Sequence, residues 1–344
     1  GLKADGSIVA WGSNGDGQTN VPAPNSGFIA VAAGAAHSLG LKADGSIVGW
    51  GWNFHGQTNV PAPNTGFVAV AGGGAHSLGL KGNGSIVAWG CGNPENYGQC
   101  NVPFPNTGFV AVAAGLYHSL GLRADGSIVA WGRNDYGQTN VPSGTFTAIA
   151  AGGQHSLALK GGNPIVGWGN NSNGQTNVPA GTFTAVAAGW YHTLAIRIDG
   201  TLVGWGLNVD GQINVPSGTF TAVAAGNYYG LAIRSDGTLV GWGLNNNGQI
   251  NVPAGTFVAV AAGGGHSLAI RTDGTLTGWG YNASGQTNVP AGTFTAVAAG
   301  SYHSLAIRSD GTLAGWGSNN FGQINVPPGT FVDIAAGDSH SLAI

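Results

Sequence analysis

Eight of the nine histidines in this sequence occupy one repeated position, and histidine has the widest chemical repertoire of the residues here. Imidazoles bind a metal ion only when several lie about 2.1 Å from it, and side chains of separate repeats are spread apart. We therefore expect no metal site and a structural hydrogen-bonding role. Tyr229 takes the position in the remaining repeat, and His55 lies outside it in a variable loop that we expect to be exposed. The repeated histidines are His37, His76, His118, His155, His192, His266, His303 and His340.

The other reactive residue types form no catalytic constellation. Acidic residues in the variable loops stand singly in different repeats, and neither a carboxylate pair nor a Ser-His-Asp set is evident. The glycine-rich turns do not join a strand to a helix, so they offer no helix N-terminus to a phosphate. We expect neither an enzyme nor a cofactor.

The two cysteines, Cys91 and Cys100, bracket the one insertion in the sequence. A metal site would need further ligands nearby, and the insertion offers only Glu95. A local disulfide is the favoured interpretation, with two free buried thiols as the alternative. A disulfide favours a secreted or cell-surface protein.

Composition narrows the class of protein and the class of partner. Glycine supplies 65 of 344 residues and charged residues only 7%, which indicates many strands joined by tight turns. The formal net charge of -3 and the lack of a Lys/Arg cluster argue against nucleic acid and against an anionic membrane as partners. No run of eighteen apolar residues predicts a transmembrane helix. No signal peptide is evident, and the start in mid-repeat without Met is compatible with a piece of a longer protein.

A Trp-Gly pair recurs nine times, with spacings of 39, 39, 42 and then 37 residues five times. Self-similarity at a fixed period predicts one structural unit per repeat. The tryptophans are expected to be structural, as packing anchors between units, because they are present in every repeat. They are Trp11, Trp50, Trp89, Trp131, Trp168, Trp205, Trp242, Trp279 and Trp316.

Residues 219–254 show the elements of one repeat. Alternation with period two predicts strands at Thr219–Ala225, Tyr229–Arg234 and Thr238–Trp242, and a short outer strand at Gln249–Pro253. Asp236-Gly237 predicts a two-residue hairpin. Four antiparallel strands make one blade of a β-propeller.

The two ends of the sequence are halves of one repeat. Residues 340–344 match a second strand, and residues 1–6 match the end of that strand and its hairpin. We therefore predict an all-β fold, a closed β-propeller of nine short antiparallel blades, with residues 1–344 as a single domain and the last blade completed by both termini. Closure would remove the exposed sheet edge of a linear array.

Other repeated residues are also assigned to the scaffold. The glutamines and asparagines that follow each Trp-Gly are expected to brace loops by hydrogen bonds. Nine of the ten basic residues stand just before a hairpin, and seven hairpins carry a partner Asp, so we expect a solvated rim there.

Residues 298–305 (Ala-Ala-Gly-Ser-Tyr-His-Ser-Leu), followed by Trp316-Gly317, resemble the repeat of the regulator of chromosome condensation family. The resemblance covers the whole sequence, and the short, regular repeats are most similar to a secreted bacterial branch that inhibits β-lactamase. The resemblance implies a propeller fold and suggests a bacterial origin. It implies no single partner, because the family spans exchange factors, inhibitors and uncharacterised surface proteins.

Nearly all the variation between repeats lies at one end of each predicted blade. Because strands alternate in direction, the turn after the first strand and the loop after the third lie at this end, the loop face, opposite the Asp-Gly hairpins of the hairpin face. Variation on one face of a constant scaffold is typical of a binding surface. The loop face is mildly acidic and aromatic, with candidate partner-binding residues Trp52, Phe54, Tyr97, Tyr117 and Tyr136 in a first group and Trp190, Tyr191, Tyr228, Tyr281, Tyr302 and Phe321 in a second.

We expect a monomer that binds an unknown protein or peptide through the second group. Trp190 and Tyr191 stand where other repeats have Ala-Ala or Gly-Gly, and rigid aromatic side chains are the usual hot-spot residues. Two alternatives stay open. One is a purely structural repeat domain of a larger surface protein, and the other is a carbohydrate-binding propeller, since aromatic rings beside Asn and Asp also suit sugars.

Overall fold

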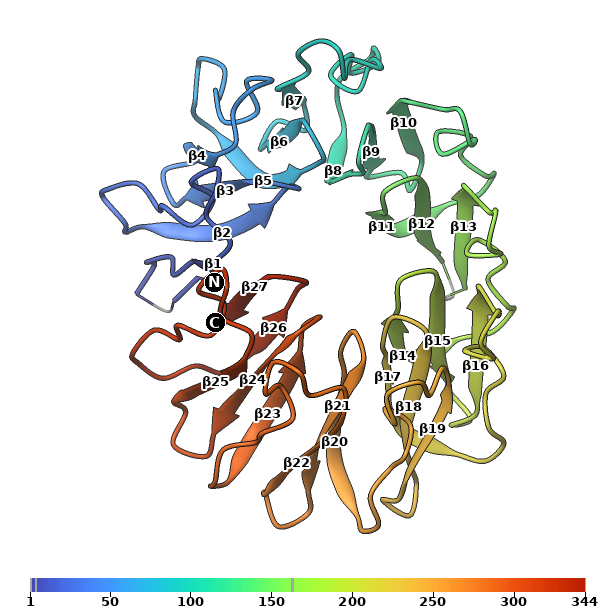
Figure 1. Cartoon of the computed structure of the whole chain (residues 1–344). Coiled ribbons are helices and arrows are strands. Elements are labelled where there is room, and N and C mark those ends of the chain that lie inside the picture. Colours follow the sequence, from blue (N-terminus) through green and yellow to red (C-terminus); the bar gives the residue numbers. More distant parts are fainter. Residues whose placement is uncertain (1, 4, 162–163, 344) are drawn as a thin grey trace. The chain divides into compact units, whose positions relative to one another are not determined.

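The computed structural model describes residues 2–3, 5–161 and 164–343 of the 344-residue chain. Within these residues, 27 β-strands form nine three-stranded antiparallel sheets (Figure 1). The chain divides into two compact units, unit 1 (residues 1–10 and 14–172) and unit 2 (residues 11–13 and 173–344). No helix in the described part of the chain is long and apolar enough to span a membrane. Gly1, Ala4 and Ile344, which belong to the repeat predicted to be shared by the termini, lie outside the described residues.

Unit 1 contains four sheets whose strands follow one another in sequence order. Their strands are β2 (Phe28–Ala33), β3 (His37–Lys42) and β4 (Ile47–Gly51); β5 (Phe67–Gly72), β6 (Ser77–Lys81) and β7 (Ile86–Trp89); β8 (Phe109–Ala114), β9 (His118–Arg123) and β10 (Ile128–Gly132); β11 (Phe146–Ala151), β12 (His155–Lys160) and β13 (Ile165–Gly169).

Unit 2 contains five sheets, the last of which includes a strand from near the N-terminus. In that sheet β1 pairs with β27, with Trp11 opposite Ser341 and Gly12 opposite His340. The strands are β14 (Phe183–Ala188), β15 (His192–Arg197) and β16 (Leu202–Gly206); β17 (Phe220–Ala225), β18 (Tyr229–Arg234) and β19 (Leu239–Gly243); β20 (Phe257–Ala262), β21 (His266–Arg271) and β22 (Leu276–Gly280); β23 (Phe294–Ala299), β24 (His303–Arg308) and β25 (Leu313–Gly317); β26 (Ile334–Ala336), β27 (His340–Ala343) and β1 (Trp11–Gly12).

The prediction of a fourth strand in each blade is wrong. In the repeat predicted in detail, the segment Gln249–Pro253 forms turns because its amides are used locally. The Asn251 N–H donates to the Gly248 carbonyl (3.0 Å) and the Val252 N–H to the Ile250 carbonyl (2.9 Å). These amides are therefore not available to a ladder with β19, and each blade has three strands.

The hairpin between β18 and β19 is also longer than the two residues predicted. The Arg234 N–H donates to the Thr238 carbonyl (2.8 Å), so three residues form the loop, and Gly237 takes a φ of +84°. Asp236 Oδ1 accepts hydrogen bonds from the backbone N–H (2.9 Å) and the hydroxyl (2.7 Å) of Thr238. The hydroxyl bond holds the pKa of Asp236 below its usual value.

The hydrophobic core lies between successive sheets of a unit. In one cluster Leu268 and Ile270 of β21 pack against Phe294, Ala306 and Trp316 of the next sheet. Trp316 is buried there, with 8% of its surface exposed. The repeated tryptophan thus fills the space between two blades, where removal of a large aromatic side chain costs about 3–5 kcal/mol.

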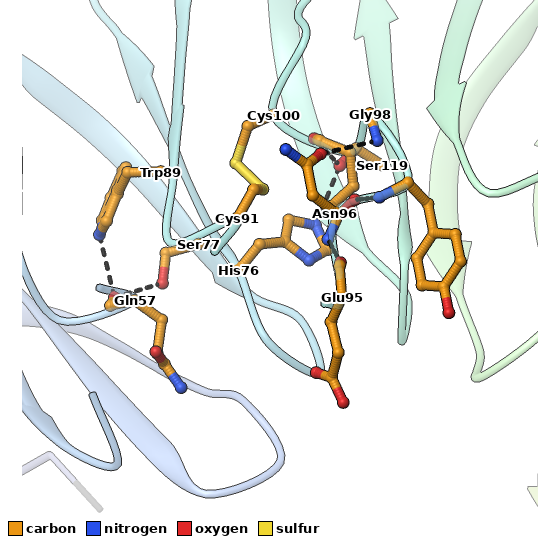
Figure 2. Close-up of a disulfide and its surroundings, with 12 residues drawn as sticks. Gln57, His76, Ser77, Trp89, Cys91, Glu95, Asn96, Gly98, Cys100 and Ser119 are labelled. Atoms are coloured by element: carbon orange, nitrogen blue, oxygen red, sulfur yellow. Dashed lines mark hydrogen bonds between the residues drawn. A yellow bond between two sulfur atoms is a disulfide. The ribbon is translucent and has the colours of Figure 1, made fainter. Parts of the chain in front are cut away.

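In seven repeats the backbone carbonyl of a glutamine in the preceding loop accepts hydrogen bonds from two side chains. The Gln57 carbonyl, after β4, accepts hydrogen bonds from Ser77 Oγ (2.8 Å) and Trp89 Nε1 (2.9 Å) of the next sheet (Figure 2). In unit 2 the Gln286 carbonyl accepts from Ser304 Oγ (2.9 Å) and Trp316 Nε1 (2.8 Å) in the same way. We call this arrangement, with the histidine described next, the Gln–Ser–His relay.

In five repeats the relay also fixes the proton on the histidine. His37 Nε2 lies 3.0 Å from Ser77 Oγ. Because the single hydroxyl hydrogen of Ser77 is donated to Gln57, the serine must accept from the imidazole, which therefore carries its proton on Nε2. His37 Nδ1 is buried and has no hydrogen-bond partner. The same bond joins His303 to Ser341 (2.9 Å). Burial lowers the pKa of His37 and His303 to about 4, so both are neutral near pH 7.

One repeat replaces two relay residues together. Tyr229 and Gly230 stand where other repeats have His and Ser, and the buried Tyr229 hydroxyl donates to the His266 carbonyl of the next sheet. Ser267 Oγ lies 3.2 Å from that hydroxyl. A Cβ on Gly230 would come within 2.5 Å of Trp242 Cζ2, so no larger residue fits there without movement.

The basic residues before the hairpins are half-buried, which corrects the prediction of a solvated rim. The Arg234 guanidinium lies 5.3 Å from the centre of the Phe220 ring and donates to the Ser217 carbonyl (3.1 Å). Lys42 takes the corresponding place over Phe28, at 5.0 Å. A cation is attracted to a ring face, so these side chains cover the core.

We predict that the free energy of unfolding falls as the pH is lowered from about 6.5 toward 4. Burial lowers the pKa of His37, His118, His192, His266 and His303 to about 4 and that of His76 to about 3. Unfolded histidine titrates near pH 6.5, so the unfolded chain binds more protons across this window and each such histidine removes about 1.4 kcal/mol per pH unit. Urea unfolding at pH 7.5, 6 and 5 measures the loss.

The variant His303→Gln keeps an N–H donor toward Ser341 without a titrating ring, and it should reduce the pH dependence by one proton. An unfolding midpoint that does not move between pH 7.5 and 5 would contradict the burial of neutral histidines.

Candidate functional site

The turn between the first two strands of a sheet fixes two exposed positions. In unit 2 the Gly189 N–H donates to the His192 carbonyl (2.9 Å). A Cβ on Gly189 would lie 2.3 Å from His192 Cε1 and 2.4 Å from the Gly226 carbonyl oxygen, so glycine is required. The two residues between them project from the sheet, and Trp190 and Tyr191 keep 56% and 46% of their surfaces exposed.

The loop after the third strand is held by its own amide side chains. Asn245 Oδ1 accepts from the Ile250 N–H (3.2 Å), and Gln249 Oε1 accepts from the Asn247 N–H (2.8 Å). The Leu244 N–H donates to the Tyr228 carbonyl (3.0 Å), which ties this loop to the turn between β17 and β18. The two segments therefore lie at the same end of the sheet, as the predicted strand directions require.

In unit 2 the structure brings aromatic side chains of neighbouring repeats into contact. The Trp190 ring lies 6.0 Å from Tyr191 and 6.0 Å from Tyr228, both edge to face. Tyr281 and Tyr302 form a second edge-to-face pair at 6.1 Å. Such pairs add to the burial of their surfaces, so they form rigid platforms on the loop face.

Two cavities lie between these platforms. The first, of about 220 Å³, is lined by the turns of five repeats, including Trp190, Asn227, Ser301 and Asp338. The second, of about 260 Å³, includes Tyr302, and the two cavities share Asn227, Gly264 and Ser301. We call this continuous depression the unit 2 groove. Ser301 Oγ donates to Asp338 Oδ1 (2.7 Å), which fixes the carboxylate at its rim.

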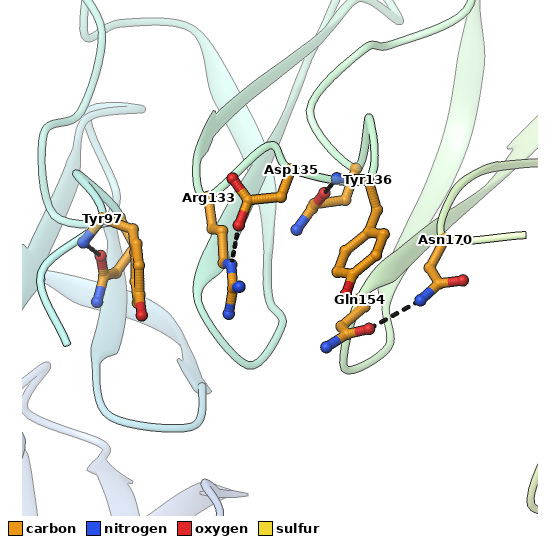
Figure 3. A network of polar contacts seen from close by, with 8 residues as sticks. Tyr97, Arg133, Asp135, Tyr136, Gln154 and Asn170 are labelled. Atoms are coloured by element: carbon orange, nitrogen blue, oxygen red, sulfur yellow. Dashed lines mark hydrogen bonds and ion pairs between the residues drawn. The ribbon is translucent and has the colours of Figure 1, made fainter. Parts of the chain in front are cut away.

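Unit 1 carries a different cluster in which aromatic rings surround one cation. The Arg133 guanidinium lies 4.8 Å from the centre of the Tyr97 ring and 5.8 Å from that of Tyr117. Its Nε is 2.6 Å from Asp135 Oδ2, and Tyr136 projects from the same loop (Figure 3). The charge of Arg133 is therefore compensated within the cluster.

The prediction that His55 is exposed is wrong, because the cysteine insertion folds over it. His55 is 8% exposed, and its Nε2 lies 3.3 Å from Glu95 Oε2 in the insertion. Cys91 and Cys100 form the predicted disulfide at the base of this loop, with Cα atoms 6.0 Å apart (Figure 2). Trp52 and Phe54 place their rings at right angles to the imidazole, at 5.1 and 4.9 Å.

Glu95 also faces the following repeat. Burial and the hydrogen bond to Glu95 raise the pKa of Tyr117. Glu95 of the insertion thus contacts His55 in the repeat before it and Tyr117 in the repeat after it. Sequence reasoning missed both contacts, because the insertion has no counterpart in the other repeats.

The candidate partner-binding residues divide by exposure. Those with more than 40% of their surface exposed are Phe54, Tyr97, Tyr136, Trp190, Tyr191, Tyr302 and Phe321. Those that are half-buried are Trp52, Tyr117, Tyr228 and Tyr281. Among the described residues, no group of three or more His, Cys, Asp or Glu side chains is arranged to hold a metal ion.

The model of the regulator of chromosome condensation (RCC1) repeat matches eight segments of the chain: residues 28–57, 67–99, 109–138, 146–175, 183–212, 220–249, 257–286 and 294–323. Among curated proteins, none matches the chain at a significant level.

Solved structures with a similar fold include Prp20p from Saccharomyces cerevisiae, 19% identical over 98% of this chain and 90% of that chain, with a TM-score of 0.51. A structure of yeast RCC1 (Prp20) with Kap60 is 18% identical over 98% and 88% of the two chains, with a TM-score of 0.51. The ectodomain of the receptor kinase CR4 from Physcomitrella patens is 25% identical over 67% of this chain and 69% of that chain, with a TM-score of 0.49. The likeness to the yeast structures is one of fold.

Proposed function

The chain belongs to the regulator of chromosome condensation (RCC1) repeat family, and we propose that it is a non-enzymatic scaffold that binds a protein or peptide through the loop face of unit 2. One observation carries this proposal. The turn Gly34-Ala35-Ala36-His37 has the same place in its repeat as the turn that contains Trp190 and Tyr191, so the scaffold does not need large aromatic residues there.

The exposed rings have the properties of recognition residues. Their turn is fixed by Gly189 and His192, so Trp190 and Tyr191 offer large contact areas at little cost in conformational entropy. The described structures of Prp20p concern its binding to Gsp1p and histones and the binding of yeast RCC1 by Kap60, which supports a protein as the class of partner.

The disulfide supports a secreted or cell-surface location for this scaffold, since such bonds persist in oxidising compartments. On the resemblance expected from the repeat sequence, a β-lactamase is the first protein to test as a partner, followed by a pull-down from the extracellular medium. Carbohydrate binding is the second candidate, because tyrosine rings, Asn227, Asn247 and Ser301 line the unit 2 groove.

We predict that Trp190→Ala weakens the affinity for the partner by roughly 2 kcal/mol or more, about 30-fold, because the indole is a central aromatic anchor. Its thermal melt should match that of the parent, because the turn at residues 34–37 tolerates alanine in that place. Titration calorimetry with the captured partner measures the affinity. Asp236→Asn, on the hairpin face, is the control and should bind as the parent does. The proposal fails if Asp236→Asn weakens binding and Trp190→Ala does not, or if Trp190→Ala unfolds the domain.

We also propose that the nine blades close into one ring and that the protein is a monomer. The pairing of β1 with β27 supports closure, because a strand from near the N-terminus completes the C-terminal sheet. Small-angle X-ray scattering should then give a radius of gyration near the value for a compact chain of this length, about 20 Å. An open array or a dimer would give a radius well above it.

A further inference from the structure

The unit 2 groove is lined by a carboxylate and by aromatic rings, and no lysine or arginine is among its lining residues. Asp338 lines the first cavity together with Trp190, and Asp210 is exposed in the loop after β16 on the same face. Within the described part of unit 2, the four Lys and Arg residues, Arg197, Arg234, Arg271 and Arg308, each end a second strand at the hairpin face. The loop face of unit 2 therefore carries the carboxylates of Asp210 and Asp338 beside aromatic rings, and no Lys or Arg side chain in the described part of unit 2 lies there to neutralise them.

The arginines of unit 2 are also held where they are. The guanidinium groups of Arg271 and Arg308 lie over the Phe257 and Phe294 rings, at 5.1 and 5.2 Å, and each donates to a carbonyl of the preceding connection. They cannot neutralise the opposite end of their sheets. A ligand that does so must bring its own cation.

The chain places a cation over an aromatic ring in two kinds of setting. Arg234 lies over Phe220 at the hairpin face, and Arg133 lies over Tyr97 beside the Asp135 carboxylate in unit 1. The second case combines an aromatic ring, a carboxylate and a guanidinium. The unit 2 groove is lined by an aromatic ring, Trp190, and by a carboxylate, Asp338, and no lysine or arginine lines it.

The size and shape of the groove favour one side chain of a larger ligand. A cavity of about 220 Å³ is smaller than the usual site of a drug-sized molecule. It continues past Asn227 and Ser301 to the Tyr281–Tyr302 pair, which gives the residues beside that side chain a polar and aromatic surface to contact. Because Ser301 occupies one position on the Asp338 carboxylate, the remaining acceptor capacity can serve a cationic donor.

We propose that the unit 2 groove binds a lysine or arginine side chain of a peptide segment, with the cation at the Asp338 carboxylate and the adjoining part of the segment in the same cavity, which Trp190 also lines. This inference rests on the proposed function and adds the chemistry of the partner. The flanking residues of the peptide lie along Asn227 toward Tyr302. A charge-assisted hydrogen bond to the Asp338 carboxylate acts on the cation, so the site discriminates against neutral and acidic segments.

Three fluorescein-labelled nonapeptides test the proposal, with identical Gly-Ser flanks and a central Lys-Lys, norleucine-norleucine or Glu-Glu pair. Norleucine keeps the lysine stem and lacks the charge. Fluorescence anisotropy with the full chain at 50 mM salt should give at least tenfold tighter binding of the lysine peptide than of the other two. Affinity for the lysine peptide should fall severalfold at 300 mM salt.

Matched variants locate the site. Asp338→Asn should lower the affinity for the lysine peptide about tenfold and leave that of the norleucine peptide unchanged, whereas Trp190→Ala should weaken both. Asp236→Asn, an acid-to-amide change on the hairpin face, should change neither. Thermal melts of all three variants show whether they are folded.

The outcomes separate this inference from the proposed function. If norleucine and lysine peptides bind equally and Trp190→Ala weakens both, peptide binding stands and the cation site is wrong. If the lysine peptide binds and Trp190→Ala and Asp338→Asn leave it unaffected, both proposals are wrong for this face. If none of the peptides binds, the cation site is overturned. Binding of neutral oligosaccharides on an array, lost in Trp190→Ala, would replace the peptide with a glycan.

Discussion

In seven repeats the carbonyl oxygen of one glutamine is the acceptor on which packing against the next sheet depends. The Gln57 carbonyl receives the Ser77 hydroxyl and the Trp89 indole N–H from the next sheet, and the serine in turn accepts from His37. Four groups that would be costly to bury alone are thereby satisfied at one apolar interface. Because one member of the set is a backbone atom, the relay sets the separation and the register of the two sheets together.

Each repeat therefore contains residues that pack the blades together and residues that do not take part in packing. The relay, the glycine under the histidine and the tryptophan between the sheets leave little freedom inside a blade, and the arginine or lysine at the hairpin covers the phenylalanine ring. The two positions between that glycine and the histidine bear none of these duties. In unit 2 these positions hold Trp190, Tyr191, Tyr228 and Tyr302. The residue type therefore differs between repeats at positions where a change does not disturb the packing of the blades.

Repetition made much of the blade predictable, and local hydrogen bonding explains where prediction failed. The second strand Tyr229–Arg234 has the predicted bounds, since its alternation and its hairpin are both visible in the sequence. The outer strand at Gln249–Pro253 was wrong because its amides bond within the loop. The burial of His55 depends on Glu95, forty residues later in an insertion without a counterpart. The relay acceptor is a backbone carbonyl, which leaves no signature in residue types, and the unit 2 groove depends on how five turns converge.

The central claim is that the exposed loop-face side chains of unit 2 contribute little to the stability of the fold, whereas the residues of the relay contribute substantially. Urea unfolding of two variants tests it most directly: the triple substitution Trp190→Ala, Tyr191→Ala and Tyr302→Ala, and the single substitution Ser304→Ala. Ser304 satisfies both Gln286 and His266, so its loss should cost about 1–3 kcal/mol, while each of the three exposed substitutions should change stability by at most about 0.5 kcal/mol. If the triple variant loses more than about 1.5 kcal/mol and Ser304→Ala loses less than about 1 kcal/mol, the division between scaffold and binding surface is wrong.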